Sequence, residues 1–531
     1  MLTYTPPEMR AAPPTREKPW ILLLLAFAWL WPGVFSHDLW KPDEIWFNEA
    51  VNGVLSGGSW LQPQVPGRQD GGMPFVYVWL AAWCRRLLSP WLTDAYSAMR
   101  LASVLFTAVG LTACGMAGFH LAGRHQGRSV VLILIGCAGL ITGGHLLGGA
   151  SVQFAAAGLC LYGLAVARRR AIFAALLLGC GWTLLSVSAG WAVMAALMLA
   201  ACLLPLFPVW RSRRFAVSLA AAFALAVPLA AVYPLALYQV SPEAFSGWLN
   251  HHVFGVFGGL ATFSAAFSLP YYLKNLLWFA FPAWPLALWT FSRRRFLSES
   301  WGGPTVLWLA AVGLLLAAAP QTHADNLILL LPPLAVLGAC RLDSLRRGAA
   351  AFFNWFGIMT FGSLALFVWL GFFAMNFGWP AKLAERAAYF SPYYQRDIDY
   401  FPVIVAVLFT PVWLLAITRK YVRGRQAVTN WAAGLTLCWS LILTLFLPWL
   451  DAAKSYRPVV RRLEAKLPAD ACVSAQHPVV RHAWQEYSRY PLGENCRFIA
   501  TLRHEAVPDA AELASANRPR EKHEAFVLWQ R

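Results

Sequence analysis

Long apolar segments alternate with short polar ones along almost the whole chain. A helix needs about 20 residues to cross a bilayer. Runs of sufficient length without Asp, Glu, Lys or Arg lie at 20–36, 101–123, 129–167, 171–209, 215–240, 275–292, 301–320, 326–340, 351–381, 401–418 and 426–450. Two of them have double length, and each contains a break, near Gly149 and near Gly190, where two helices are expected to meet in a tight turn. The pattern therefore predicts about thirteen membrane-spanning helices.

Composition supports a membrane protein. Of the 531 residues, 59% are hydrophobic and only 13% are charged, so the apolar surface is too large to be covered without lipid. The net charge of +18 is not a sign of nucleic-acid binding, because the basic residues stand in short clusters between apolar runs, as they do in multi-pass proteins. We therefore expect no nucleic-acid partner.

The basic clusters also predict an orientation. With the N-terminus in the cytoplasm, thirteen alternating spans place the clusters at 124–128, 168–170, 211–214, 293–295, 341–347 and 419–425 on the cytoplasmic side. The apolar segment 73–88 would reverse this order if it crossed the membrane, so we expect it to form a juxtamembrane helix outside. No signal-peptide cleavage site follows the first apolar run, which is expected to remain as an anchor.

The outer side then collects the polar residues. It receives the loops 37–100, 241–274, 321–325 and 382–400 and a tail domain at 451–531, while residues 1–450 form the membrane domain. The spans are almost bare of ionisable side chains, with His145 inside one of them. Because transporters carry such groups near the middle of their helices, the pattern favours chemistry at the outer surface. A lipid-linked glycan flippase or transporter is the alternative.

The first external loop begins with two adjacent carboxylates. Asp43 and Glu44 come directly before an amphipathic segment, 45–55, so Asp43 is expected near the N-terminus of a helix. An acidic residue there stabilises a helix without any further function. Alternatively, a carboxylate orients or deprotonates an acceptor and meets the positive charge that develops at the anomeric carbon of a sugar.

Around these carboxylates the sequence resembles the polyprenyl-phosphate-dependent glycosyltransferases of the GT-C type, in particular the branch of protein mannosyltransferases and aminoarabinose (lipid A) transferases. Residues 41–83 read KPDEIWFNEAVNGVLSGGSWLQPQVPGRQDGGMPFVYVWLAAW. They contain the Asp-Glu pair, GSWLQP in place of the family's GDWL.P, DGGMP in place of its Glu-Lys-Pro-Pro, and an aromatic helix. Segments that start at Ser241, Asn326 and Lys454 also resemble the family. The resemblance covers most of the chain and implies an all-α GT-C fold.

The resemblance also implies a function. We expect an inverting glycosyltransferase of the bacterial inner membrane, which transfers a sugar from undecaprenyl phosphate to lipid A or another lipopolysaccharide component at the periplasmic face. A protein or another glycan is the alternative acceptor. The expected catalytic residues are Asp43, Glu44 and Asp70. The growing charge of the leaving phosphate needs cationic or hydrogen-bonding partners, and the candidates are His251, His252, Lys41, Arg68, Lys274 and Lys454.

The sequence departs from the family at several positions. Asp70 corresponds only approximately to the Glu of the Glu-Lys-Pro-Pro motif, whose Lys is missing. Trp46 stands where the family has an Arg, and Gln153 stands where it has the Asp of an Arg-x-Asp motif. The sugar and the acceptor can therefore differ from aminoarabinose and lipid A.

Two further expectations concern metals and disulfides. His251 or His252 could bind a divalent metal together with an external carboxylate, although adjacent histidines rarely share one ion; no other cofactor is expected. Of ten cysteines, only Cys472 and Cys496 lie in the tail. Both stand next to predicted strands, at 471–474 and 497–502, in an oxidising compartment, so we predict a disulfide within a small α/β domain.

Overall fold

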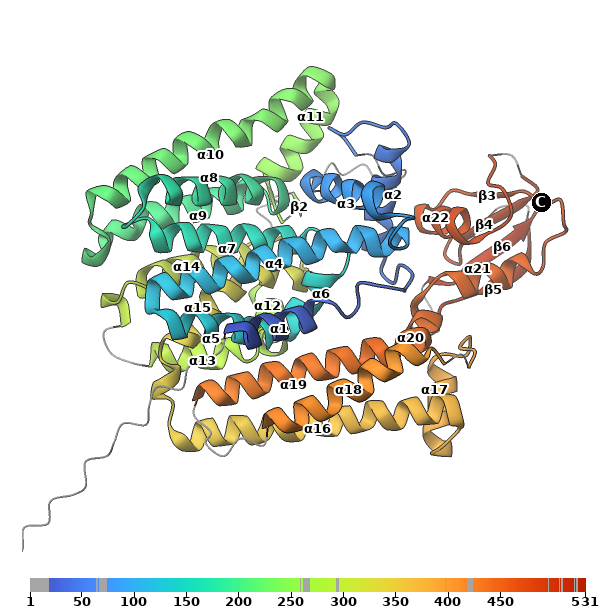
Figure 1. Cartoon of the computed structure of the whole chain (residues 1–531). Helices are drawn as coiled ribbons and strands as arrows, with labels where there is room; N and C mark the ends of the chain where they lie inside the picture. The colour runs from blue at the N-terminus through green and yellow to red at the C-terminus, as the bar shows by residue number, and fades with distance from the viewer. Residues whose placement is uncertain are drawn as a thin grey trace, which may run out of the picture.

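The computed structural model is a bundle of helices with a small sheet domain at one end (Figure 1). It describes residues 19–531 except 64, 66–73, 258, 261–267, 293–295, 397, 418–423, 495, 506, 508–509, 520 and 522–523. The first half of the bundle contains α1 (Pro19–Leu30), α2 (Pro42–Leu55), α3 (Phe75–Leu88), α4 (Ala95–Ala122), α5 (Arg124–Ile135), α6 (Ala138–His145), α7 (Ala150–Val166), α8 (Ala171–Ser188), α9 (Trp191–Leu203), η1 (Leu204–Leu206), η2 (Pro208–Trp210), α10 (Arg213–Val240) and α11 (Pro242–Trp248).

The second half continues to the end of the membrane region. It contains η3 (Leu249–Val253), the short strands β1 (Gly255–Val256) and β2 (Gly259–Leu260), α12 (Leu269–Phe279), α13 (Ala283–Phe291), η4 (Phe296–Ser298), α14 (Gly302–Ala317), η5 (Ala324–Leu330), α15 (Leu331–Cys340), η6 (Leu342–Ser344), α16 (Arg347–Phe377), α17 (Ala381–Phe390), α18 (Tyr400–Ile417), α19 (Gly424–Leu445) and α20 (Leu447–Lys454). In Figure 1, α16, α18 and α19 lie side by side along one flank of the other helices.

Several helices have the length and composition of membrane spans. Among the described residues, α4, α8, α10, α16 and α19 are long and apolar enough to cross a bilayer. The pair α5 and α6, bent by 78° at its break, makes a sixth candidate. The other apolar helices, such as α7 and α14, are shorter. The chain is therefore a largely helical protein with five to six clear candidate spans.

The two double-length apolar runs are interrupted at the glycines where the sequence predicted a break. Helix α8 ends at Ser188 and α9 starts at Trp191, and Gly190 between them has a φ of +97°, which side chains other than glycine rarely adopt. The turn before α7 likewise falls at Gly149. The structure adds two breaks that hydropathy did not indicate, after Ile135 and after Phe279. The two breaks are close in space, because Gly139 of α6 packs directly against the ring of Phe279.

The C-terminal domain combines two helices with a four-stranded sheet. Its elements are α21 (Arg457–Glu464), β3 (Val473–Ala475), α22 (Pro478–Tyr487), β4 (Phe498–Leu502), β5 (Ala511–Ala516) and β6 (Phe526–Gln530). The strand order is β3-β4-β6-β5, with β3 parallel to β4 and the other pairs antiparallel. The expected pair, Cys472 and Cys496, is joined by a disulfide with a Cα–Cα distance of 5.5 Å. Strands β5 and β6 were not predicted; β5 is a mostly exposed edge strand without an apolar alternation, and β6 is a short buried strand close to the end of the chain.

One hydrophobic core joins this domain to α2 and α3. Ile45 and Val51 of α2, Tyr77 of α3, and Val460 and Trp484 of the C-terminal domain belong to the same cluster of buried side chains. In Figure 1 the C-terminal domain accordingly lies next to α2 through its helix α22, and α3 lies on the other side of α2. Packing of this kind fixes α2 between the helical bundle and the C-terminal domain.

Candidate functional site

The two adjacent carboxylates lie in the first turn of α2 and point to different surroundings. Pro42 occupies the start of the helix, where its missing N–H has no cost. Asp43 is exposed, whereas Glu44 is fully buried. The helix begins three residues earlier than the predicted 45–55, so both carboxylates lie inside it. Only Asp43 is accessible to a substrate in this arrangement.

Glu44 is enclosed by hydrogen-bond donors. Arg100 Nε lies 3.3 Å from Glu44 Oε1, and both side chains are shielded from solvent. The carboxylate also accepts from the backbone N–H of Trp40 (3.0 Å) and of Leu147 (3.3 Å). Burial alone would raise the pKa of Glu44, but the charge of Arg100 and the N–H donors outweigh it and hold the pKa below its usual value. Glu44 is therefore an ionised residue that organises the loop.

Arg100 ties the start of the loop to α4. Its Nη1 donates to the carbonyl of His37 (2.9 Å) and its Nη2 to that of Asp38 (2.8 Å). Burial, together with the nearby charge of Arg100, lowers the pKa of His37 to about 4, so the imidazole is neutral near pH 7. The buried ion pair of Glu44 and Arg100 is thus the point where three segments meet: residues 37–40, the start of α2 and the turn before α7.

A second cluster of charged side chains joins the segment before α2 to the C-terminal domain. Arg457 donates two hydrogen bonds to Asp38, of 2.9 and 2.7 Å. Asp451 accepts from the backbone N–H of Asp38 (2.9 Å) and from the indole of Trp40 (2.8 Å). Burial, and then the neighbouring Asp38, raise the pKa of Asp451 to about 6. The loop is therefore held from both sides just before it reaches Asp43.

Helix α2 and the start of α4 are held by the C-terminal domain as well. Tyr96 donates to Glu486 (2.6 Å), and Glu49 is hydrogen bonded to His482. Arg518 donates to the carbonyls of Trp40 (2.7 Å) and Lys454 (2.8 Å), which brings Lys454 next to the start of the loop. These contacts surround the loop on the side away from the membrane helices.

Aromatic contacts connect the segment with the two histidines to α3 through Tyr233 of α10. The ring of Phe75 stacks on Tyr233 of α10 at 3.8 Å. Tyr233 contacts Trp248 of α11 at 5.9 Å, and Trp248 stacks on His252 at 5.7 Å. His252 is buried, and its carbonyl lies against Gly190. The predicted histidine loop therefore belongs to the same end of the molecule as the carboxylate loop (Figure 1).

The remaining predicted residues have varied positions. Lys41 is exposed and precedes α2, so it is adjacent to Asp43. Lys454 is half exposed and lies 3.9 Å from Glu521, and Lys274 is exposed on α12. Asp70 and Arg68 lie outside the described residues. Within the described part of the chain, no three His, Cys, Asp or Glu side chains are grouped to hold a metal ion. A metal at His251 or His252 stays a prediction.

Sequence reasoning missed the residues that hold the loop. They are Arg100, Asp38, Asp451, Arg457 and His482. Arg100 gives a weak signal, because it is a lone arginine at the start of an apolar run. The partners of the Asp38 side chain, Ser455 and Arg457, lie more than 400 positions away in the chain, and no local pattern relates them.

The membrane bundle, the juxtamembrane first loop and the C-terminal sheet domain together define the fold of a GT-C glycosyltransferase of the aminoarabinose transferase type. The structure of ArnT from Cupriavidus metallidurans bound to undecaprenyl phosphate matches with a TM-score of 0.61 over 96% of this chain and 97% of that one, at 15% identity. The apo structure of the same protein matches with a TM-score of 0.63 over 96% of this chain and 98% of that one, also at 15% identity.

Sequence comparison leads to the same group of proteins. No protein-family profile matches the chain. The undecaprenyl phosphate-alpha-4-amino-4-deoxy-L-arabinose arabinosyl transferase of Pseudomonas paraeruginosa (strain DSM 24068 / PA7) is 26% identical over 456 residues, which are 81% of this chain and 76% of that protein. The transferase of the same name from Pseudomonas aeruginosa (strain UCBPP-PA14) is 26% identical over 457 residues, with the same coverage. The resemblance predicted from the motifs is thereby confirmed.

Proposed function

We propose that this protein transfers a sugar from a polyprenyl phosphate, such as undecaprenyl phosphate, to a lipid A or related glycan acceptor at the outer surface of the bacterial inner membrane. The observation that carries the proposal is the exposed Asp43 on a loop held in place by Glu44 and Arg100, in a chain similar to arabinosyl transferases along most of its length. A protein or another glycan is the second acceptor class.

Asp43 is the residue we assign to the reacting centre. In an inverting transfer the acceptor oxygen attacks the anomeric carbon from one side, and the bond from that carbon to the lipid phosphate breaks on the other. A hydroxyl acceptor would lose its proton to Asp43, whereas a phosphate acceptor is already ionised and needs only orientation. In both cases the carboxylate stabilises positive charge at the anomeric carbon. Asp70 is a further candidate for this centre.

The residues around Asp43 have supporting roles in this proposal. Glu44 is a positioning residue, because its buried carboxylate is committed to Arg100 and two backbone N–H groups. Lys41, Lys454 and His252 are candidate partners of the leaving phosphate, since the first two lie next to the loop and the third lies in the loop that packs against α3. His251, Lys274 and Arg68 complete the candidates.

We also propose the full topology that the basic clusters indicate. Thirteen crossings with a cytoplasmic N-terminus put α2, α3, α11 and the C-terminal domain in the periplasm. The Cys472–Cys496 disulfide supports this side for the domain, because disulfides persist in the periplasm and are rare in the cytoplasm. Cysteine labelling of single exposed positions in the C-terminal domain of intact cells tests the orientation.

Mass spectrometry of lipid A and total lipopolysaccharide tests the function directly. Cells expressing the wild type, Asp43→Asn or an empty vector are compared, and Asp470→Asn serves as a matched control because Asp470 is an exposed aspartate of the C-terminal domain. We expect one sugar increment with the wild type and the control variant, and its loss with Asp43→Asn. Identical profiles at equal protein abundance would exclude lipid A and lipopolysaccharide as acceptors. Full activity of Asp43→Asn would instead contradict the assigned chemistry.

A further inference from the structure

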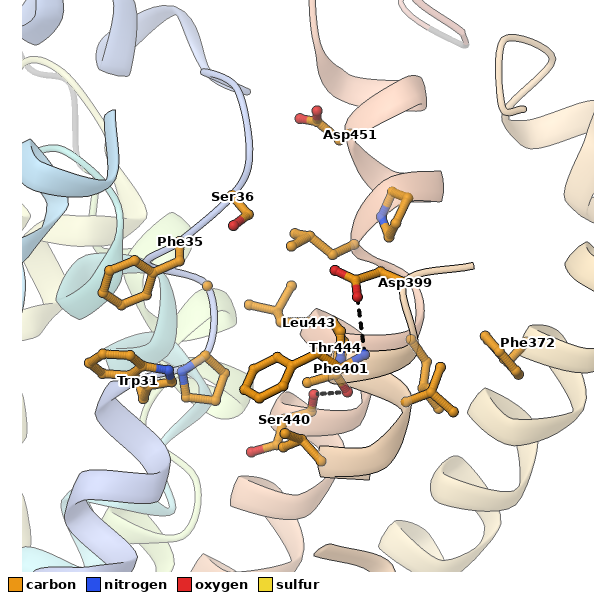
Figure 2. A pocket seen from close by; sticks show the side chains of 18 of the residues that line it. Trp31, Phe35, Ser36, Phe372, Asp399, Phe401, Ser440, Leu443, Thr444 and Asp451 are labelled. Atoms are coloured by element: carbon orange, nitrogen blue, oxygen red, sulfur yellow. Dashed lines mark hydrogen bonds between the residues drawn. The ribbon is translucent and has the colours of Figure 1, made fainter. Parts of the chain in front are cut away.

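A cavity of about 830 Å³ lies between the end of α1 and the flanking helices α16, α18 and α19 (Figure 2). This volume falls within the range of about 300–1,000 Å³ that is typical of ligand sites. The segment 31–38, which leads from α1 towards α2, forms one wall. Figure 2 shows side chains from that segment and from α18 and α19 converging on the same space.

Most of the cavity wall is apolar and belongs to membrane helices. Trp31 of the α1 end, Phe401 of α18 and Leu443 of α19 line it. Phe401 is 75% exposed and Phe27 of α1 is 61% exposed, so this wall is in contact with the surroundings of the helices, which is the bilayer. A hydrocarbon chain that enters from the bilayer exchanges one apolar environment for another, so this wall accepts it without a large cost and the selectivity of the site depends on its polar end.

The other end of the cavity carries an excess of negative charge. Among the described residues, the charged side chains that line it are Asp38, Asp399, Asp451 and one cation, Arg457. Arg457 is committed to Asp38 by two hydrogen bonds. Asp399 accepts a hydrogen bond from the backbone N–H of Phe401, and Asp451 accepts one from the backbone N–H of Asp38. Neither carboxylate forms an ion pair within the described residues. This end therefore repels an anionic head group and attracts an ammonium group.

A buried hydroxyl group in the wall lacks a partner. Ser440 of α19 is 3% exposed and lines the cavity, and its Oγ has no hydrogen-bond partner among the residues that the structure describes. In Figure 2 it lies deeper in the membrane region than Asp451 and Ser36. An unpaired buried hydroxyl costs about 1–3 kcal/mol. A ligand with an acceptor oxygen below its head group would remove that cost.

We propose that this cavity binds a glycerophospholipid with a primary ammonium head group, of the phosphatidylethanolamine type. The acyl chains would lie along Trp31 and Phe401, an ester carbonyl would accept from Ser440, and the ammonium group would lie between Asp399 and Asp451. The site is separate from the donor chemistry, whose phosphate the carboxylates would repel. Asp451 also accepts hydrogen bonds from the backbone of Asp38 and the indole of Trp40, in the segment that leads to Asp43. A lipid bound at Asp451 would therefore stabilise that segment.

Native mass spectrometry of the full-length protein in detergent tests the proposal. The probes are dioleoyl phosphatidylethanolamine, dioleoyl phosphatidylglycerol and undecaprenyl phosphate. We expect one tightly bound phosphatidylethanolamine, at least about tenfold tighter than phosphatidylglycerol, which corresponds to one ionic interaction of about 1.4 kcal/mol. The double variant Asp399→Asn/Asp451→Asn should lose this preference. Asp470→Asn, an exposed aspartate elsewhere, should keep it.

Photo-crosslinking provides a second test, in which the wild type is compared with one cavity-filling variant. A diazirine-bearing phosphatidylethanolamine should label peptides from α1, α18 and α19, and Thr444→Phe, which fills the cavity, should abolish that labelling. Equal or tighter binding of phosphatidylglycerol or undecaprenyl phosphate overturns the head-group assignment. Labelling confined to other helices overturns the site. Sugar transfer is measured separately, so failure of this proposal leaves the proposed function standing.

Discussion

Replacing Glu44 with glutamine should destabilise the protein far more than replacing its neighbour Asp43 with asparagine. Both changes remove one negative charge from the first turn of α2. Glu44→Gln leaves Arg100 as a buried and uncompensated cation. Removal of one partner of a buried ion pair costs about 3–5 kcal/mol. Asp43 is exposed, and its replacement should change stability by no more than about 0.3–1 kcal/mol, the value of its interaction with the helix dipole.

A double-mutant cycle separates the ion pair from its surroundings. Glu44→Met and Arg100→Met are combined, because an apolar replacement of a whole buried pair is often close to neutral. The double variant still leaves the carbonyls of His37 and Asp38 without the Arg100 donor and the N–H groups of Trp40 and Leu147 without the Glu44 acceptor, at about 1–3 kcal/mol each. We expect the double variant to be less destabilised than the sum of the single variants.

Thermal unfolding of the purified protein in detergent, followed by size-exclusion chromatography, measures these differences as midpoint temperatures. The expected order is wild type and Asp43→Asn highest, the double variant in between and Arg100→Met lowest. Sugar transfer is assayed on the same preparations well below the midpoints. If Glu44→Gln were as stable as Asp43→Asn, or if the two single Met variants were strictly additive, the buried pair would not be the structural centre of the loop.

Three further predictions follow from individual positions. Asp451→Asn should gain stability relative to the wild type as the pH rises from 5 to 8 in lipid-free detergent, by about 1.4 kcal/mol, because part of the cost of ionising Asp451 is already present at pH 5. The raised pKa of about 6 means that the stability contribution of Asp451 is present below its ordinary value and lost as the pH rises through 6; an equal difference at both pH values would contradict it. Gly190→Ala should lower the midpoint temperature of unfolding, because the φ of Gly190 is +97° and the added Cβ would lie 3.2 Å from the carbonyl oxygen of His252. Gly313→Ala is the control and should leave the midpoint unchanged, because Gly313 has open space around it. Cys472→Ser/Cys496→Ser should cost about 2–4 kcal/mol in the C-terminal domain, visible as faster proteolysis of that domain; unchanged proteolysis would count against it.

Hydrophobic periodicity was sufficient for much of the fold. The breaks near Gly149 and Gly190 were predictable because glycine interrupts an apolar run that is too long for one crossing. The prediction that 73–88 forms a separate helix agrees with α3, which starts at Phe75, and its juxtamembrane position stays a prediction. The breaks after Ile135 and Phe279 were not predictable, because they depend on one another through the contact of Gly139 with Phe279. Contacts between distant segments leave no periodic signal in either of them.

The candidate site shows the same limit at the level of single residues. The pattern located Asp43 and Glu44 but did not distinguish them, because both precede an amphipathic helix in the same way. The distinction arises from α4, whose Arg100 faces only one of the two carboxylates, and from the N–H of Leu147, about a hundred residues further along the chain. A helix turns by about 100° per residue, so one of two neighbouring carboxylates is directed into the protein and the other away from it. The buried carboxylate fixes the loop, and the exposed one is therefore the group that can meet a sugar.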